Sequence, residues 1–296
     1  MPKKLLFLLD TDPVPSVFDT VVGYDGGADR VIGYGGVTPE NAGPLVDGTI
    51  YTRGPKEKQF TAIFVGGSGM TAGEAVFEAV KKRFFANFRV SAMLDSNGSN
   101  TTAAAGVALL AKAKPLKGKR AVVLAGTGPV GMRAAAMLHS EGAEVAITSR
   151  IKQRAEAAAK AINDRFGFLP APIEAFDNAA RATAVKGAEI VFAAGAIGIP
   201  LLDEKHWQTD PRIELIADCN AQPPLGIGGI EATDKAKERH GKIVIGALEK
   251  ERFSADGRYF KIKDGHIVPR PTPGRKFRIF LGGTSDSTYE LAGERG

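Results

Sequence analysis

Three glycines in the middle of the chain have the spacing of a phosphate-binding turn. Gly126, Gly128 and Gly131 follow the pattern G-x-G-x-x-G. In this pattern the first glycine permits a tight turn, the second lets the backbone approach a pyrophosphate, and the third lets a helix pack closely on a strand. A helix that begins at such a turn offers free N–H groups and the positive end of its dipole to the phosphates. The pattern therefore predicts that the chain binds a dinucleotide.

The elements around the turn favour this interpretation over a tight turn that binds nothing. An apolar run at residues 121–125 is typical of a strand buried on both faces, and an alanine-rich helix begins directly after the glycines. A strand before the motif and a helix after it are the context that the fingerprint requires. The residues expected to contact the cofactor are Gly126, Thr127, Gly128, Pro129, Val130 and Gly131.

The end of the next strand indicates which dinucleotide is bound. Residues 144–149 have the pattern of a strand, and Ser149, Arg150, Lys152 and Arg154 stand at its end. An NAD site would have Asp or Glu here for the ribose 2′-hydroxyl, whereas an NADP site has Arg and hydroxyl donors for the 2′-phosphate. The alternative is that the cations only solvate the start of a helix at residues 152–165, but a helix N-terminus disfavours positive charge. We therefore predict NADP.

Two later strands are expected to end beside the nicotinamide half of the same site. They are predicted at residues 189–194 and 213–219, and ligands of open parallel sheets lie beyond the carboxyl ends of the strands. The amide side chains at the second end are suited to orienting a carboxamide or a pterin ring; loop capping is an equal alternative. The residues expected at these two ends are Ala194, Gly195, Ile197, Asn220 and Gln222.

Composition limits the classes of partner. The chain has 296 residues, 44% hydrophobic and 24% charged, which is ordinary for a soluble protein with room for two domains. Its net charge of +6 is spread over scattered Lys and Arg without a basic run, so we expect no nucleic acid partner; a small polyanionic ligand explains the excess. The single Cys219 excludes an intrachain disulfide and a cysteine metal cluster, and its apolar surroundings indicate a buried, inert thiol. No metal site is predicted.

The N-terminal apolar segment is predicted to be a strand. It resembles a signal peptide, but it is short and ends at Asp10 and Asp12 without a small-residue cleavage site. No apolar run approaches the roughly eighteen residues of a membrane helix. We therefore expect a cytoplasmic protein without a membrane partner.

Strand-like and helix-like segments alternate along most of the chain, which predicts an α/β fold. We expect two domains: an N-terminal α/β domain with a parallel sheet at residues 1–102, and a Rossmann-type NADP-binding domain at residues 103–248. A polar loop is expected at 95–102.

At residues 249–296, two Asp-Gly pairs flank an alternating segment and predict a hairpin, followed by a proline-rich loop. In the first domain, the predicted strands are 5–9, 30–34, 61–65 and 90–94, and the predicted helices start at 17, 38, 71 and 103.

Long motifs closely resemble a known family. They are residues 7–27, VDGTIYTRG at 46–54, LDSNGSNTTAAAG at 94–106, VLAGTGPVGMR at 123–133 and NAQPPLGIGG at 220–229. The sequence resembles the NADP-dependent methylene-tetrahydromethanopterin dehydrogenases of methylotrophic bacteria over residues 1 to about 248. The resemblance implies two α/β domains with a cleft between them, a homo-oligomer, and hydride transfer from methylene-tetrahydromethanopterin to NADP⁺, giving the methenyl form. Some members also accept methylene-tetrahydrofolate.

The resemblance also suggests residues for the pterin substrate. A carboxylate near the methylene group would stabilise the cationic product; Asp19 and Asp25 are candidates for this role, and Asp95, in a polar run at a predicted strand end, is a further catalytic candidate. Lys263 is the candidate counterpart of a family active-site lysine, although its spacing to His266 differs from the family pattern. The expected substrate-binding residues are Phe18, Asp25, Asn97 and Asn100. For Phe18 the alternative is a core position, and for Asp25 it is a turn.

Two other functions are consistent with the same motifs. A shikimate dehydrogenase-like reductase would use a Lys and an Asp of the first domain on a hydroxyl group, and Lys56 and Asp95 are a possible pair. A non-catalytic NADP-binding protein would bind the dinucleotide without turnover.

Overall fold

The computed structural model describes residues 2–220, 223–246, 252–256 and 261–266, the last two ranges as backbone only. The chain divides into two compact units. The described residues of unit 1 are 2–99, 252–256 and 261–266, and those of unit 2 are 100–220 and 223–246. The division falls after Ser99, the first residue of a helix that continues to Ala113, three residues before the predicted boundary at 102.

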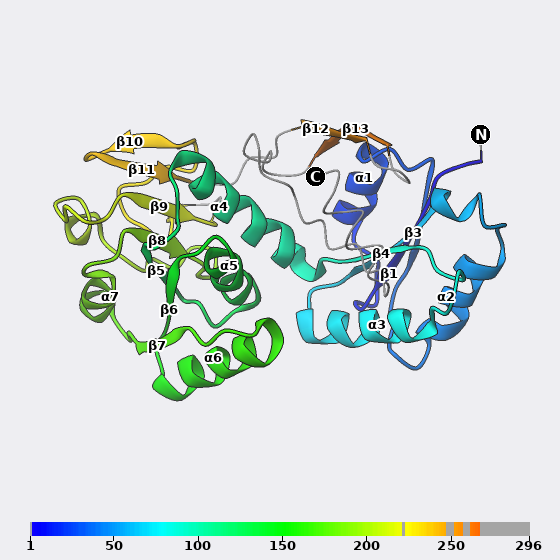
Figure 1. Ribbon diagram of the computed structural model, residues 1–296, viewed down its shortest axis with the longest axis horizontal. Helices are drawn as coiled ribbons and strands as arrows, with labels where there is room; N and C mark the ends of the chain where they lie inside the picture. The colour runs from blue at the N-terminus through cyan, green and yellow to red at the C-terminus, as the bar shows by residue number, and fades with distance from the viewer. Residues whose placement is uncertain (1, 221–222, 247–251, 257–260, 267–296) are drawn as a thin grey trace. The chain divides into compact units, whose positions relative to one another are not determined.

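Unit 1 is built on a parallel sheet with the strand order β2-β1-β3-β4. Helices α2 and α3 bury Val46, Ile50, Val76 and Val80 against one face of this sheet, and α1 lies on the other face (Figure 1). The elements are β1 (Leu5–Asp10), α1 (Val17–Asp25), β2 (Arg30–Tyr34), α2 (Ala42–Tyr51), η1 (Lys58–Phe60), β3 (Thr61–Gly66), α3 (Met70–Arg83), β4 (Ser91–Leu94) and η2 (Ser96–Gly98).

Unit 2 contains a seven-stranded sheet with the order β10-β11-β9-β8-β5-β6-β7, in which only β10 is antiparallel. Counted from β5, the six parallel strands have the order 3-2-1-4-5-6 of a Rossmann fold. The elements are α4 (Ser99–Ala113), β5 (Arg120–Leu124), α5 (Pro129–Ser140), β6 (Glu144–Ser149), α6 (Lys152–Phe166), β7 (Ala171–Glu174), α7 (Asn178–Val185), β8 (Ile190–Ala193), η3 (Glu204–His206), β9 (Leu215–Asp218), β10 (Lys237–Arg239) and β11 (Lys242–Ile245).

Two apolar clusters cover the two faces of the unit 2 sheet. On one face, α4, α5 and α6 pack through residues such as Leu110, Leu138 and Ile162. On the other face, α7 and the segment that carries the fully buried Trp207 pack over the strands. Because apolar residues of β5 contribute to both clusters, β5 is buried on both sides, as its apolar run predicted. The turn that follows β5 is therefore held at the centre of the sheet.

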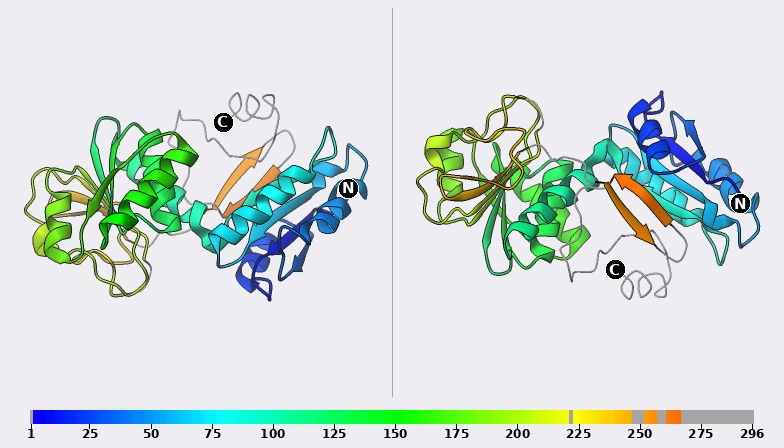
Figure 2. Two further views of the ribbon diagram at one scale, coloured as in Figure 1. Left: turned by 90° about the horizontal axis from the view of Figure 1, so that it is seen from below. Right: turned by 90° about the horizontal axis from the view of Figure 1, so that it is seen from above.

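In the segment predicted as a hairpin, the structure describes two strands, while the predicted proline-rich loop lies outside the described residues. Strands β12 (Arg252–Asp256) and β13 (Lys261–His266) pair antiparallel, and both views of Figure 2 show them as adjacent arrows. The Asp-Gly pair at 264–265 lies inside β13 and not in a turn, which corrects that part of the prediction. Among the described residues, no helix combines the length and the apolar content needed to cross a bilayer.

Candidate functional site

The glycine-rich turn joins the end of β5 to the start of α5. Helix α5 begins at Pro129 with Gly128 at its N-cap, and no side chain caps it. A Cβ atom at Gly131 would lie 2.6 Å from the Cα of Gly126, so no side chain fits there without moving backbone. A Cβ atom at Gly126 would lie 2.9 Å from the Cβ of Ile147. These two glycines are required for the fold of the turn itself.

Gly128 differs from the other two glycines because a Cβ atom at this position would meet no protein atom within 4 Å. Its φ of −83° is open to any residue, so neither the backbone nor the packing requires glycine. A glycine that the fold does not need, at the uncapped start of a helix, leaves room for a ligand to approach the backbone. The turn therefore fits the pyrophosphate of a dinucleotide, in agreement with the prediction from the G-x-G-x-x-G spacing.

Thr148 fixes the turn to the neighbouring strand, a role that the sequence motif does not reveal. The N–H of Ala125 donates to Oγ1 of Thr148 at 3.1 Å, and the N–H of Gly126 donates to the carbonyl of Thr148 at 3.0 Å. These bonds hold Ala125 at a φ of +53°, which a non-glycine residue rarely adopts. Thr148 is 1% exposed, so the turn is supported from within the sheet.

The predicted NADP-recognition residues lie where β6 ends. Ser149 is buried, and its hydroxyl accepts from the N–H of Ile151 at 3.4 Å. Arg150 and Arg154 are exposed, and neither is paired with a carboxylate in the described part of the chain. The backbone N–H of Lys152 donates to Oε1 of Glu174 at 3.1 Å. The strand end therefore presents a hydroxyl and two guanidinium groups.

The loops after β8 and β9 are joined to each other through Asn220. Its Nδ2 donates to the carbonyl of Ala196 at 3.4 Å, and its N–H donates to Oδ1 of Asp218 at 2.9 Å. This is the loop-capping alternative considered for the amide, and it places Ala194, Gly195 and Ile197 beside the carboxyl end of β9. Gln222 lies outside the described residues.

Asp218 is a buried carboxylate that the sequence analysis missed. Burial raises its pKa, opposed by the backbone N–H groups of Asn220, Ile227 and Gly226 that donate to it. Burial also raises the pKa of the adjacent Cys219 thiol far above its ordinary value, and the charge of Asp218 adds to this shift. The thiolate is therefore disfavoured, as expected for an inert cysteine. The signal available in the sequence was an Asp directly after an apolar run.

In unit 1, four of the predicted residues gather at the carboxyl ends of the strands. Helix α1 starts there with Phe18 and Asp19, and Phe18 is 64% exposed, so the core alternative for Phe18 is wrong. Asp95 is buried directly after β4, where its N–H donates to the carbonyl of Val65 at 3.1 Å. Asn97 is exposed and has a φ of +54°. The carboxylates of Asp19, on α1, and Asp95, beyond β4, thus lie at the same end of the sheet.

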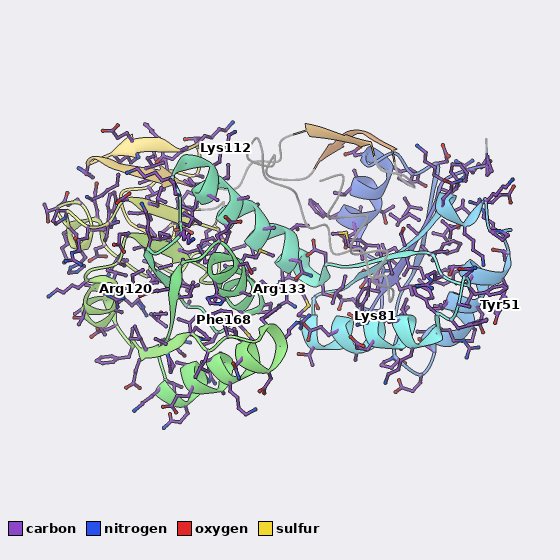
Figure 3. All side chains as sticks on the ribbon, viewed as in Figure 1. Tyr51, Lys81, Lys112, Arg120, Arg133 and Phe168 are labelled. Carbon is purple, nitrogen blue, oxygen red and sulfur yellow. The ribbon has the colours of Figure 1, made fainter. Side chains whose placement is uncertain are left out.

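The other two predicted substrate-binding residues are Asp25 and Asn100. Asp25 is the last residue of α1, at the opposite end of the sheet, where β2 begins. Asn100 belongs to α4, and its Oδ1 accepts a short hydrogen bond from Nε of the buried Arg133, labelled in Figure 3. The predicted loop at 95–102 is helical from Ser99 onward because of such contacts. The structure therefore does not bring Asp25 together with Phe18, Asp19, Asp95 and Asn97, and the role of Asn100, the first residue of unit 2, stays a prediction.

Comparison with known proteins identifies the family. Residues 17–97 match the model of the N-terminal domain of methylene-tetrahydromethanopterin dehydrogenase. The chain is 67% identical over 250 residues to the bifunctional protein MdtA of Methylorubrum extorquens, covering 84% of this chain and 87% of that protein. It is 30% identical over 257 residues to an NAD(P)-dependent methylenetetrahydromethanopterin dehydrogenase of the same organism, covering 84% and 86%. The chain belongs to the methylene-tetrahydromethanopterin dehydrogenase family.

The family resemblance inferred from the motifs is therefore confirmed. Among solved structures, ornithine carbamoyltransferase from Pyrococcus furiosus shares the fold, with a TM-score of 0.51, 12% identity, and coverage of 82% of this chain and 79% of that one. This likeness concerns the α/β fold alone. The family match at 17–97 includes Phe18, Asp19, Asp95 and Asn97, the residues that unit 1 gathers at one end of its sheet.

Lys263 lies in β13, which belongs to unit 1. Only the backbone of this strand is described, so the role of the Lys263 side chain stays a prediction.

Proposed function

We propose that this protein is an NADP-dependent methylene-tetrahydromethanopterin dehydrogenase. The observation that carries the proposal is an open glycine-rich turn at the switch point of a Rossmann sheet, in a chain that belongs to this family. The names of its relatives state the pterin substrate and the NAD(P) cofactor. We also propose methylene-tetrahydrofolate as a second substrate, on the basis of the family resemblance.

The choice of NADP over NAD is supported by the end of β6. Position 150, where an NAD site would have a carboxylate for the ribose 2′-hydroxyl, is occupied by an exposed arginine. Glu174, the last residue of the neighbouring strand β7, accepts from the backbone N–H of Lys152. Its carboxylate is therefore already used to fix the start of α6. Ser149, Arg150 and Arg154 remain for the 2′-phosphate.

The reaction requires little acid–base chemistry from the protein. When bound, NADP⁺ supplies the acceptor for the hydride of the methylene group, and the nitrogen lone pairs of the pterin assist its departure. The residues of the chain have to orient the substrate and exclude water. In this proposal the ring of Phe18 packs on the pterin and Asn97 binds it, while Asp19 and Asp95 stabilise the cationic methenyl product electrostatically. Asn100, which follows this group in the chain, stays a proposed substrate-binding residue, whereas Asp25, at the opposite end of the sheet, is not part of the proposed site.

The shikimate dehydrogenase-like alternative is disfavoured by the geometry of unit 1. Lys56 is exposed and precedes β3, whereas Asp95 follows β4. Since β3 and β4 are parallel, these residues belong to opposite ends of the sheet. A Lys–Asp pair acting on one hydroxyl group is therefore not formed.

The test is a spectrophotometric assay of methenyl formation from methylene-tetrahydromethanopterin, with NADP⁺ and with NAD⁺ in separate reactions. We expect turnover with NADP⁺ and much weaker turnover with NAD⁺. Absence of product with both cofactors would contradict the enzymatic proposal. NADP⁺ binding without turnover of this substrate or of methylene-tetrahydrofolate would favour a non-catalytic NADP-binding protein. Oxidation of shikimate would favour the shikimate dehydrogenase-like reductase.

Two further expectations belong to the same proposal. Assembly into a homo-oligomer is implied by the family resemblance and is tested by light scattering on the purified protein. A cytoplasmic location is supported by the use of the N-terminal apolar segment as β1, the strand between β2 and β3. Fractionation of the producing cell tests it.

A further inference from the structure

The ends of β6 and β7 bring two arginines to the same end of the unit 2 sheet. The strands are parallel neighbours with Ser149 opposite Glu174, and the N–H of Ala175 donates to the carbonyl of Ser149 at 2.7 Å. Arg150 follows β6 directly. Arg181 lies on α7, the helix that follows β7.

Backbone carbonyls hold the guanidinium of Arg181 in place. Its Nη1 donates to the carbonyl of Leu201, beyond β8, at 3.1 Å. Its Nη2 donates to the carbonyl of Phe176, just beyond β7, at 3.3 Å. Both acceptors are neutral and both follow the carboxyl ends of strands. The contacts therefore fix the position of the cation without neutralising its charge.

The charges around Arg181 favour an additional anion. Burial lowers the pKa of Arg181, the carboxylate of Asp177 opposes this shift, and the positive charge of Arg150 adds to it. The two guanidinium groups therefore repel each other. Asp177 caps α7 by accepting from the N–H of Ala180 at 2.7 Å. Across residues 2–220 and 223–246, neither arginine forms an ion pair with a carboxylate.

We propose that Arg181 is a specificity-determining residue that binds the 2′-phosphate of NADP together with Arg150. This inference rests on the proposed function, because the fingerprint places the adenosine ribose at the end of β6. A phosphate monoester accepts hydrogen bonds from planar guanidinium groups through several oxygens. It would also relieve the repulsion between the two cations. Arg181 lies thirty-one positions after Arg150 (181 − 150), so a sequence fingerprint centred on β6 does not include it.

The test measures dissociation constants for NADP⁺ and NAD⁺ by isothermal titration calorimetry, without pterin, because these ligands differ only in the 2′-phosphate. Arg181→Gln in the full chain should weaken NADP⁺ binding about tenfold, the equivalent of about 1.4 kcal/mol, and leave NAD⁺ binding within about twofold. Arg181→Lys, which keeps the charge, should recover part of the loss. In combination with Arg150→Gln, the losses should be less than additive because both residues contact one group.

Arg120 provides a matched control. Its guanidinium, labelled in Figure 3, also donates to backbone carbonyls, those of Ala184 at 3.1 Å and of Lys186. Arg120 is the first residue of β5, at the opposite end of the strand from the glycine-rich turn. Arg120→Gln should leave both dissociation constants unchanged.

The outcomes separate this inference from the proposed function. If Arg181→Gln weakens NADP⁺ and NAD⁺ equally, Arg181 only supports the loops, and the inference is wrong. The inference is also wrong if Arg181→Gln changes neither dissociation constant although the wild-type protein binds NADP⁺ more tightly than NAD⁺. A wild-type protein that binds neither dinucleotide would overturn the proposed function and this inference with it. A wild-type protein that binds NADP⁺ but does not oxidise the pterin would overturn the proposed function alone.

Discussion

At the level of single residues, the glycine-rich turn separates what the fold needs from what a ligand needs. Gly131 packs on the backbone of Gly126, and Gly126 packs on Ile147. Gly128 faces open space in a backbone conformation that alanine also adopts. The G-x-G-x-x-G spacing does not distinguish the three positions. Their surroundings do: Gly126 and Gly131 are needed for packing, and Gly128 leaves room for a ligand.

Alanine substitutions at these positions should therefore have different effects. Gly131→Ala should lower the free energy of unfolding by about 1–3 kcal/mol, because its Cβ atom would collide with backbone, and should weaken NADP⁺ binding as well. Gly128→Ala should leave stability within about 0.5 kcal/mol of wild type and weaken NADP⁺ binding about tenfold. Denaturant unfolding and calorimetric titration measure the two quantities. Wild-type affinity in Gly128→Ala would mean that no pyrophosphate approaches this position.

Thr148 is a second residue whose role can be isolated. Thr148→Val keeps the shape of the side chain but removes the acceptor of the Ala125 N–H, which leaves a donor without its partner beneath the turn. We expect a loss of about 1–3 kcal/mol in the free energy of unfolding and weaker NADP⁺ binding. Thr148→Ser retains the hydroxyl and is the control. Equal stability of the Val and Ser variants would show that this hydrogen bond does not hold the turn.

At the level of elements, strands marked by apolar or β-branched runs were predictable, including the edge strand β2, whereas elements without such runs were not. The strands at 30–34 and 144–149 were predicted with their observed bounds, because apolar or β-branched runs mark them. Strand β7 was missed because it is an edge strand whose residues are largely exposed, with Pro172 among them. The short helix α7 was missed as well. Arg181 lies on α7, so it was overlooked together with that helix.

Helix starts were less predictable because local contacts displace them. Helix α2 was expected to begin at residue 38 with Pro39 in its first turn, but it begins at Ala42. Asn41 explains the difference: its Oδ1 accepts from the N–H of Thr38 at 2.8 Å, so residues 38–41 form a turn. Helix α4 starts earlier than expected because Ser99 and Asn100 make contacts that a polar sequence does not reveal.

The buried carboxylate of Asp234 is paired with Arg239 and Lys237 of β10, which gives a pH-dependent prediction. Asp234 is 1% exposed and accepts from Nε and Nη2 of Arg239 at 2.6 and 2.9 Å. Burial raises the pKa of Asp234, but the hydrogen bonds from Arg239 and from the N–H of Glu231, together with the charges of Arg239 and Lys237, outweigh it, so the pKa is lowered. A lowered pKa stabilises the folded state above the pKa of the unfolded chain, near 3.8, and this contribution is lost as the pH falls through the folded value.

Asp234→Asn should accordingly lower the free energy of unfolding by about 2–3 kcal/mol at pH 7. The difference from wild type should shrink as the pH falls below about 4. Glu231→Gln is the control, since Glu231 is well exposed and its contact with Arg239 should contribute about 0–1 kcal/mol. Urea unfolding at a series of pH values makes the comparison. A difference that does not depend on pH would contradict the role assigned to the carboxylate charge.

At the level of the whole molecule, the two units take different parts of the proposed function. All described residues assigned to the cofactor belong to unit 2, whereas Phe18, Asp19, Asp95, Asn97 and the strand that carries Lys263 belong to unit 1. Cofactor binding and pterin binding should therefore be separable by changes that affect one unit only.

Ending the chain after residue 250 tests this separation. The shortened protein lacks the β12–β13 hairpin, which belongs to unit 1, and keeps every described residue of unit 2. We expect its dissociation constant for NADP⁺ to stay within about twofold of wild type, and its oxidation of methylene-tetrahydromethanopterin to be lost. The full-length Lys263→Ala variant shows how much of that loss comes from one side chain. Loss of NADP⁺ binding on truncation would contradict the assignment of the cofactor to unit 2 alone.

The return of the chain to unit 1 has a consequence for its synthesis. A ribosome completes residues 100–246 before it reaches β12 and β13, so unit 2 is an insertion within unit 1. Because domains fold as units while the nascent chain emerges, the nucleotide-binding half is complete and can fold before unit 1 has received its last two strands. The half that begins the polypeptide must wait for nearly the whole chain to be made before its last two strands can join it.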